Sequence, residues 1–168
     1  GVLANSDPQY AMSAQAVDGA IKLTSANANL NTRKEDNGII LYKELEGDFL
    51  VQTKVVALDG QAEHRTPAYN EGGLIVLDDS GNRGQEIIHI GVFPNYNCGN
   101  MLTHVRGYSR PQYPRGNGWN YDPYLQIERT GDIFTIRTSQ DGKSWTDMPG
   151  SPINAPQFNG KKLKVGLY

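Results

Sequence analysis

Apolar and polar residues alternate most regularly in the stretch from Tyr124 to Met148. Residues 124–129 and 133–138 each alternate with a period of two, and a Thr-Gly-Asp turn separates them, which predicts a β-hairpin. The Asp-Gly pair at 141–142 suits the positive φ values of a tight turn, which predicts a second hairpin. We expect the buried faces of these strands to carry Leu125, Ile127, Phe134, Ile136 and Trp145.

The rest of the chain has the pattern of short strands separated by polar turns. Residues 72–77 form a continuous apolar run, which is typical of a strand covered on both faces. Residues 1–18 are expected to be an irregular lead-in and residues 109–122 an irregular loop, and no helical periodicity extends beyond about two turns. The remaining predicted strands are 20–24, 38–45, 49–58, 86–93, 101–108 and 163–168.

The composition agrees with an all-β fold. The chain has 168 residues, with 19 Gly and 9 Pro, which goes with many turns and few long helices. We therefore predict one domain over residues 1–168, built as an antiparallel two-sheet sandwich. The net charge of -2 argues against a broad nucleic-acid-binding surface. No apolar window of about 18 residues is present, so no membrane-spanning segment is expected, and the single Cys98 cannot form an internal disulfide.

Five short motifs occur in order between residues 38 and 168: Gly47-Asp48-Phe49, Gly73-Leu74, Arg129 with Gly131, Ser139 with Asp141-Gly142 and Trp145, and Val165-Gly166-Leu167. Their order and spacing resemble the DUF1349 family of concanavalin A-like domains. The resemblance implies a jelly roll of two antiparallel sheets, one of them concave, an architecture that hosts both lectins and glycosidases. It also implies a secreted, periplasmic or cell-surface location. The chain begins with Gly1, so the lack of a leader here has little bearing on export.

Carboxylates are the candidate catalytic residues, because retaining glycosidases use two of them about 5–5.5 Å apart. In laminarinase-like relatives these lie in an E-x-D-x-x-E pattern, which this chain lacks. Glu128 is the best isolated candidate and Glu86 the second, although a strand Glu beside polar neighbours is more often simply solvated. We therefore expect no catalytic residue, with a glycoside hydrolase as the alternative.

Oxygen-rich residues follow the apolar run at 72–77. Asp78 and Asp79 begin a stretch of ligands that calcium accepts, but the spacing of an EF-hand loop is absent and a β-turn explains the same residues. His64, His89 and His104 are not spaced as a zinc set, although His89 and His104 could lie near each other on neighbouring strands. We expect no cofactor, with calcium as the alternative.

Residues 139–145 resemble the Asp-box hairpin of sialidases, one residue short. That box is a structural turn, in which the Asp side chain accepts hydrogen bonds from backbone N–H groups and the Trp packs beneath. The expected role is structural.

The segment 95–121 is rich in aromatic and Arg residues among Pro, Gly and Asn. Sugar rings stack on flat aromatic side chains, and sugar hydroxyls bind to polar and charged groups. The alternative is that these rings cover one end of the sandwich. The candidate ligand-binding residues are Tyr96, Arg106, Tyr108, Arg110, Tyr113, Trp119 and Tyr121.

The sequence thus predicts a carbohydrate-associated domain that binds a glycan through segment 95–121 and the adjoining sheet face. A glycoside hydrolase is the first alternative, and a non-catalytic protein-interaction or adhesion module is the second. The sequence names neither the sugar nor the oligomeric state.

Overall fold

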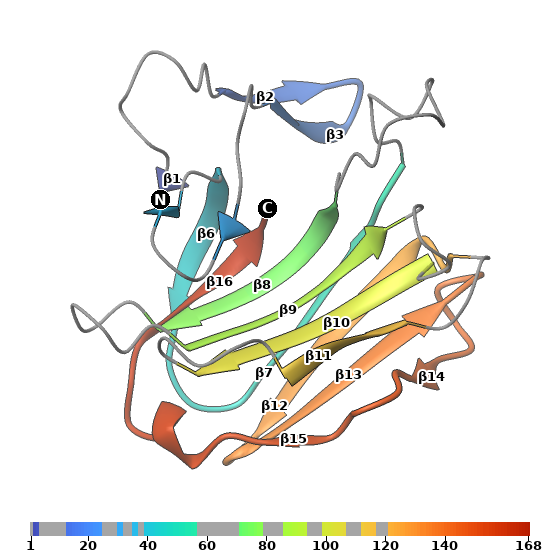
Figure 1. Cartoon of the computed structure of the whole chain (residues 1–168). Helices are drawn as coiled ribbons and strands as arrows, with labels where there is room; N and C mark the ends of the chain where they lie inside the picture. Colours follow the sequence, from blue (N-terminus) through green and yellow to red (C-terminus); the bar gives the residue numbers. More distant parts are fainter. Residues whose placement is uncertain are drawn as a thin grey trace.

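The fold was established from a computed structural model of the chain. The structure describes residues 2–3, 13–24, 30–31, 35–36, 39–56, 71–78, 86–93, 99–106, 112–116 and 121–168. These residues form antiparallel sheets that pack in a sandwich-like arrangement, so the all-β prediction is confirmed (Figure 1). No helix in these ranges is long and apolar enough to cross a membrane.

The larger sheet has seven strands in the order β1-β6-β16-β8-β9-β10-β11. Its strands curve so that the face turned away from the smaller sheet is concave, and we call it the concave face (Figure 1). The strands are β1 (Val2–Leu3), β6 (Ile40–Leu45), β8 (Gly72–Asp78), β9 (Glu86–Phe93), β10 (Gly99–Arg106), β11 (Gln112–Gly116) and β16 (Leu163–Leu167).

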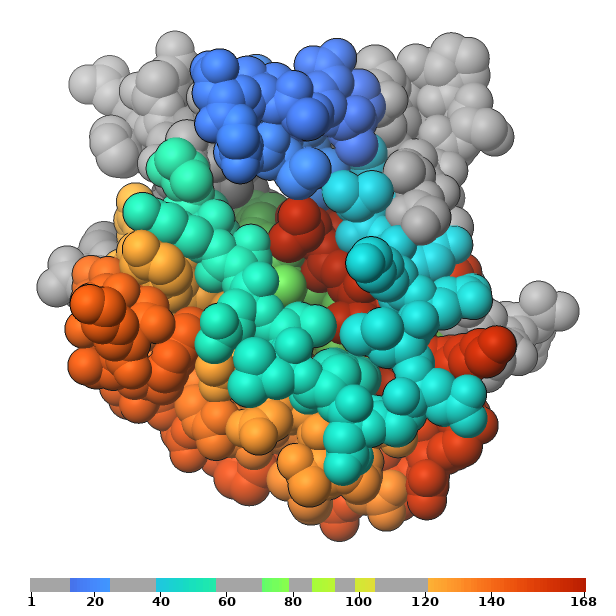
Figure 2. All heavy atoms as spheres, turned by 180° about the vertical axis from the view of Figure 1, so that it is seen from behind, coloured from blue at the N-terminus to red at the C-terminus, as the bar shows by residue number. Residues whose placement is uncertain are grey.

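The smaller sheet runs β14-β13-β12-β7, with β15 paired to β13. Its strands are β7 (Phe49–Lys54), β12 (Tyr124–Thr130), β13 (Ile133–Ser139), β14 (Thr146–Asp147) and β15 (Ile153–Asn154). A 3-10 turn, η2 (Pro156–Phe158), follows β15. Seen from behind, β7 in teal and the orange strands of this sheet form much of the surface (Figure 2).

The main core lies between the two sheets. Alternation places one side chain in two on the inner face of each strand, and in the smaller sheet Leu125, Ile127, Phe134 and Ile136 are fully buried, as predicted. Trp145 was predicted to join them but is only partly buried, because it follows the Asp-Gly turn and lies outside the strands. From the larger sheet the core receives Leu74, Val76, Ile88, Ile90, Leu102, Leu163 and Val165.

The concave face of the larger sheet is also largely apolar. Ile40, Ile75, Leu77 and Ile87 form a second buried cluster there. Strand β8 is therefore buried along its whole length, which confirms the prediction made from its continuous apolar run.

Two small sheets complete the described elements. They are the hairpin of β2 (Ser13–Val17) with β3 (Ala20–Thr24), and the pair β4 (Leu30–Asn31) with β5 (Glu35–Asp36). The β2–β3 hairpin lies on the concave side of the larger sheet (Figure 1).

Two segments expected to be irregular contain strands. Strand β2 lies within the predicted lead-in 1–18, and β11 lies within the predicted loop 109–122. Both are short and polar, so their pairing partners, and not their own periodicity, specify them as strands.

Candidate functional site

Two strands within the aromatic segment 95–121 form one edge of the larger sheet. Residues 99–106 form β10, which pairs along its length with β9. Residues 112–116 form β11, which pairs with β10 and is the last strand of the sheet on this side. We call β10, β11 and Tyr121 the aromatic edge. The fold thus holds these two strands beside the concave face.

Reciprocal hydrogen bonds fix the end of the aromatic edge. The fully buried Asn100 donates from Nδ2 to the carbonyl of Asp122 at 2.9 Å, and the N–H of Asp122 donates to Oδ1 of Asn100 at 2.7 Å. The side chain of Asp122 then accepts hydrogen bonds from Thr138 at 2.6 Å and from Gln140 at 2.6 Å. Asp122, which follows the edge, is therefore anchored to β10 through Asn100 and to the end of β13 through Thr138 and Gln140.

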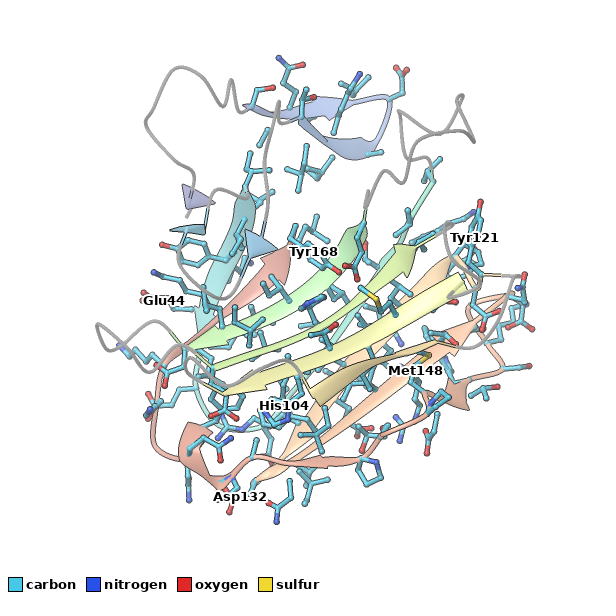
Figure 3. The ribbon with its side chains drawn as sticks, viewed as in Figure 1. Glu44, His104, Tyr121, Asp132, Met148 and Tyr168 are labelled. Atoms are coloured by element: carbon cyan, nitrogen blue, oxygen red, sulfur yellow. The ribbon has the colours of Figure 1, made fainter. Side chains whose placement is uncertain are left out.

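Three of the predicted ligand-binding residues lie within the described part of this edge. Arg106 ends β10 and Tyr113 lies in β11, and for both residues only the backbone is described. Tyr121 lies just before Asp122, with 42% of its surface exposed (Figure 3). Tyr96, Tyr108, Arg110 and Trp119 lie outside the described residues.

A polar cluster that the sequence did not indicate lies on the concave face. It consists of Glu71, which precedes β8, His89 on β9, and Tyr168, which follows β16. The Tyr168 hydroxyl donates to Oε1 of Glu71 at 2.7 Å and lies 2.9 Å from Nδ1 of His89. Nδ1 of His89 is also 3.4 Å from the same carboxylate oxygen, and the His89 and Tyr168 rings meet edge to face at 5.1 Å. We call these three residues the concave-face cluster.

Burial and a glycine shape this cluster. Burial raises the pKa of Tyr168 well above its ordinary value, and the charge and hydrogen bond of Glu71 add to the effect. Gly91 lies beneath, and a Cβ at this position would come within 2.4 Å of the Tyr168 hydroxyl and 2.6 Å of Cγ of Glu71. Only glycine leaves room for the cluster at this point of β9.

A second polar cluster lies between the sheets, at the opposite ends of β8 and β9. Asp78 and Glu86 are cross-strand partners, and only 2% and 4% of their surfaces are exposed. Oε1 of Glu86 accepts hydrogen bonds from His104 at 2.7 Å and from Gln157, while Lys161 forms an ion pair with Asp78. Each buried carboxylate thus has a cationic or hydrogen-bonding partner, as burial requires.

The calcium candidates can be followed only in part. Asp78 forms an ion pair with Lys161. Asp79 lies outside the described residues. Across the described ranges, no three His, Cys, Asp or Glu side chains are grouped as metal ligands.

The two catalytic candidates are not neighbours. Glu86 is buried between the sheets, whereas Glu128 is on the outer face of the smaller sheet, where Arg137 binds it at 2.6 Å. Arg137 also donates hydrogen bonds to Gln126 and Asp147, and its hydrogen bonds to Glu128 and Asp147 raise its pKa. The carboxylate of Glu128 therefore belongs to a surface ion-pair network.

The two histidines on neighbouring strands lie on opposite faces. His89 pairs with Thr103 and His104 pairs with Ile88, so the two side chains are out of phase by one residue. Figure 3 shows Tyr168, the partner of His89, on the concave side and His104 on the side of the smaller sheet. Each histidine instead has a glutamate partner, Glu71 or Glu86.

The Asp-Gly turn has the structure predicted for it. Oδ1 of Asp141 accepts hydrogen bonds from the N–H groups of Lys143 and Ser144, both at 2.7 Å, and from the hydroxyl of Ser139 at 2.9 Å. Gly142 has a φ of 72° and lies against the ring of Tyr124. The turn therefore supports β12 and β13, next to the anchored end of the aromatic edge.

Comparison of the chain with protein-family models, with curated proteins and with solved structures finds no match.

Proposed function

We propose that this chain is a carbohydrate-binding domain that recognises a glycan at the aromatic edge and the adjoining concave face. One observation carries the proposal. Two strands from the segment rich in Tyr, Trp and Arg form the edge of a curved sheet, and hydrogen bonds between Asn100 and the backbone of Asp122 anchor the residue that follows this segment. Aromatic side chains held on a rigid framework can stack on sugar rings without losing much conformational freedom on binding.

The proposal extends to the family, the jelly-roll topology and the cellular location that the sequence suggests. It takes the sandwich to be a concanavalin A-like jelly roll of the DUF1349 type, located outside the cell or on its surface. The order of the five motifs over residues 38–168 supports this assignment.

The separation of Glu86 from Glu128 favours binding over glycoside hydrolysis. The two carboxylates are on different sheets, so they are not placed to flank one glycosidic bond.

The test is retention of the chain on a panel of immobilised polysaccharides. Trp119→Ala should abolish retention while leaving the melting temperature nearly unchanged, because on this proposal the side chain stacks on the sugar and does not contribute to folding. Leu50→Ala is the matched control, since Leu50 is an exposed apolar residue on the outer face of the smaller sheet.

Two results would contradict the proposal. One is that no polysaccharide retains the parent chain. The other is that Trp119→Ala lowers the melting temperature by many degrees and leaves retention as it was, which would identify this residue as cover for the sandwich.

A further inference from the structure

The smaller sheet has one long edge that no described strand covers. Its opposite edge is formed by the two-residue strands β14 and β15, whereas β7 has six residues and pairs only with β12. Strand β7 contains neither proline nor glycine, and its register with β12 has no bulge. It therefore lacks the features with which edge strands commonly prevent further pairing.

The register of β7 shows which of its backbone groups point to this edge. Val55 donates its N–H to the carbonyl of Pro123 at 2.8 Å, and these two residues continue the register of β7 with β12. In an antiparallel pair, residues that bond to the neighbouring strand alternate with residues whose N–H and C=O groups point away from it. Leu50, Gln52 and Lys54 consequently direct both groups away from β12. Because β12 is the only described strand beside β7, these groups have no strand partner in the described part of the chain.

The sandwich is open between this edge and β6. Figure 2 shows a hollow between β7, in teal, and β6, in cyan, with red and green atoms of the larger sheet at its floor. Lys43 is the cross-strand partner of the core residue Val165, so it is on the inner face of β6, and yet it is exposed. The inner faces of β6, β7 and β16 contribute partly buried apolar side chains: Leu45, Phe49, Val51, Val55 and Leu167.

Two lysines without a carboxylate partner lie on either side of the open edge. Lys43 is on the inner face of β6, and Lys54 is on the outer face of β7, where its Nζ lies 5.1 Å from the centre of the Tyr124 ring. Neither lysine forms an ion pair with a described residue. Strand β7 has no acidic residue, so the same strand of a second copy would supply no carboxylate. The charges favour an acidic partner strand over self-pairing.

We infer that the open edge of β7 binds an extended segment of another polypeptide, in which apolar and acidic residues alternate. The segment adds to the smaller sheet as a strand, through the backbone groups of Leu50, Gln52 and Lys54. Its apolar side chains fill the hollow between β6 and β7, and its acidic side chains lie on the outer face beside Lys54. The inference is independent of the proposed function, because the aromatic edge belongs to the other sheet.

The test titrates the chain with a labelled, capped peptide of alternating Val and Glu, six residues long like β7, and follows binding by fluorescence anisotropy. With Val toward the hollow, the N–H groups of the Glu residues point to β7 and those of the Val residues point away. Methylation of the Glu N–H groups should abolish binding, and methylation of the Val N–H groups should leave it intact. The amide hydrogens of Leu50, Gln52 and Lys54 should exchange more slowly with solvent when the unmethylated peptide is bound.

Substitutions in the chain test the same contacts. Gln52→Pro removes an N–H group that points to the edge without removing a bond to β12, so it should abolish peptide binding and leave the chain folded. Gln52→Ala is the matched control, because it keeps the N–H group. Lys54→Glu should weaken binding of the Val-Glu peptide about tenfold, whereas Lys143→Glu, in the exposed turn after β13, should leave it unchanged.

Three outcomes would overturn the inference. The first is that the Val-Glu peptide does not bind. The second is that the peptide and its Glu-methylated form bind equally well, since apolar contact alone would then account for binding. The third is that the chain dimerises without peptide and Gln52→Pro prevents this, which would assign the edge to a second copy. None of these outcomes concerns retention on polysaccharides, so the proposed function would stand in each case.

Discussion

At the scale of single residues, protonation follows the local contacts of two side chains. Asp141 is exposed, but the N–H groups of Ser144 and Lys143 and the hydroxyl of Ser139 lower its pKa from 3.8 to about 2. Tyr168 is the opposite case, because burial beside Glu71 raises its pKa. Because of these shifts, the free energy of unfolding should depend on pH, at acid pH through Asp141 and at alkaline pH through Tyr168.

The contribution of Asp141 to stability should be lost in acid. Its pKa is lower in the folded chain, so the contribution is fully present above pH 3.8 and disappears as the pH falls from 3.8 to about 2. In Asp141→Asn, unfolding by denaturant should depend less on pH across this window. Equal pH dependence of the two proteins would contradict the assignment, and the carboxyl ¹³C resonance of Asp141 provides a direct titration.

The contribution of Tyr168 should be lost in alkali. Its pKa is raised in the folded chain, so stability is intact below pH 10.0 and falls as the pH rises above this value. Tyr168→Phe should be less stable at neutral pH by about 1–3 kcal/mol, because Glu71 and His89 lose a buried partner, but its stability should decline less in alkali. Denaturant unfolding at several pH values measures both effects, with Tyr121→Phe as the exposed control. A parent protein as stable well above pH 10.0 as at neutral pH would contradict this prediction.

At the scale of elements, the aromatic edge depends on one link between strands. Asn100 on β10 and the backbone of Asp122 exchange two hydrogen bonds and hold the segment that leads into β12. The pair thereby connects the larger sheet, which carries the edge, to the smaller sheet. Its loss should free the edge without removing core contacts.

Asn100→Ala should therefore lower the free energy of unfolding by about 1–3 kcal/mol, since it leaves partly buried backbone groups of Asp122 without these two hydrogen bonds. Gln140→Ala removes exposed hydrogen bonds to Tyr121 and Asp122 and should cost less, within about 1 kcal/mol. Chemical denaturation compares the two. Equal losses would show that burial of Asn100 does not set the cost.

The elements differ in how far their own sequence specifies them. Period-two alternation predicted β12 and β13 with their buried residues, and Asp-Gly predicted the turn that follows, because these signals are local. Strand β11 is short and contains a proline, so it exists through pairing with β10 and was predicted as loop. Trp145 is large and apolar, but it is only partly buried, because it lies beyond the turn and outside the strands.

At the scale of the whole molecule, a residue outside the strands packs in the core against the smaller sheet. Phe158 in η2 is fully buried and meets Phe134 edge to face at 5.2 Å, and Phe134 in turn meets Phe49 at 6.2 Å. Its carbonyl also accepts a hydrogen bond from the buried guanidinium of Arg129 at 3.0 Å. The link from β15 to β16 is thus part of the core.

Phe158→Ala should destabilise the fold by about 3–5 kcal/mol, because it leaves a cavity among aromatic rings. Leu50→Ala, which truncates an exposed side chain, should change stability by no more than about 0.5 kcal/mol. Thermal and denaturant unfolding provide the measurements. A loss below about 1 kcal/mol for Phe158→Ala would mean that the smaller sheet does not need this contact.

The concave-face cluster belongs to this scale as well, which is why the sequence did not reveal it. Glu71 and Tyr168 are 97 positions apart, and His89 joins them only through the pairing of β16 with β8 and of β8 with β9. A lone Glu, His or Tyr has no local signal, and strand register cannot be derived from short, strongly apolar strands. The one local hint is Gly91, because the Tyr168 hydroxyl and Glu71 lie where a Cβ at this position would be.

The place of β16 in the larger sheet has a consequence for biosynthesis. This strand lies between β6 and β8, which are both complete long before residues 163–167 leave the ribosome. Translation proceeds at about 5–20 residues per second, so β16 is synthesised on the order of 10 s after β8. During that time two apolar strands have unpaired edges, which are templates for aggregation. A nascent chain of this protein is therefore a candidate substrate for chaperones, and its expression should respond to translation speed and temperature.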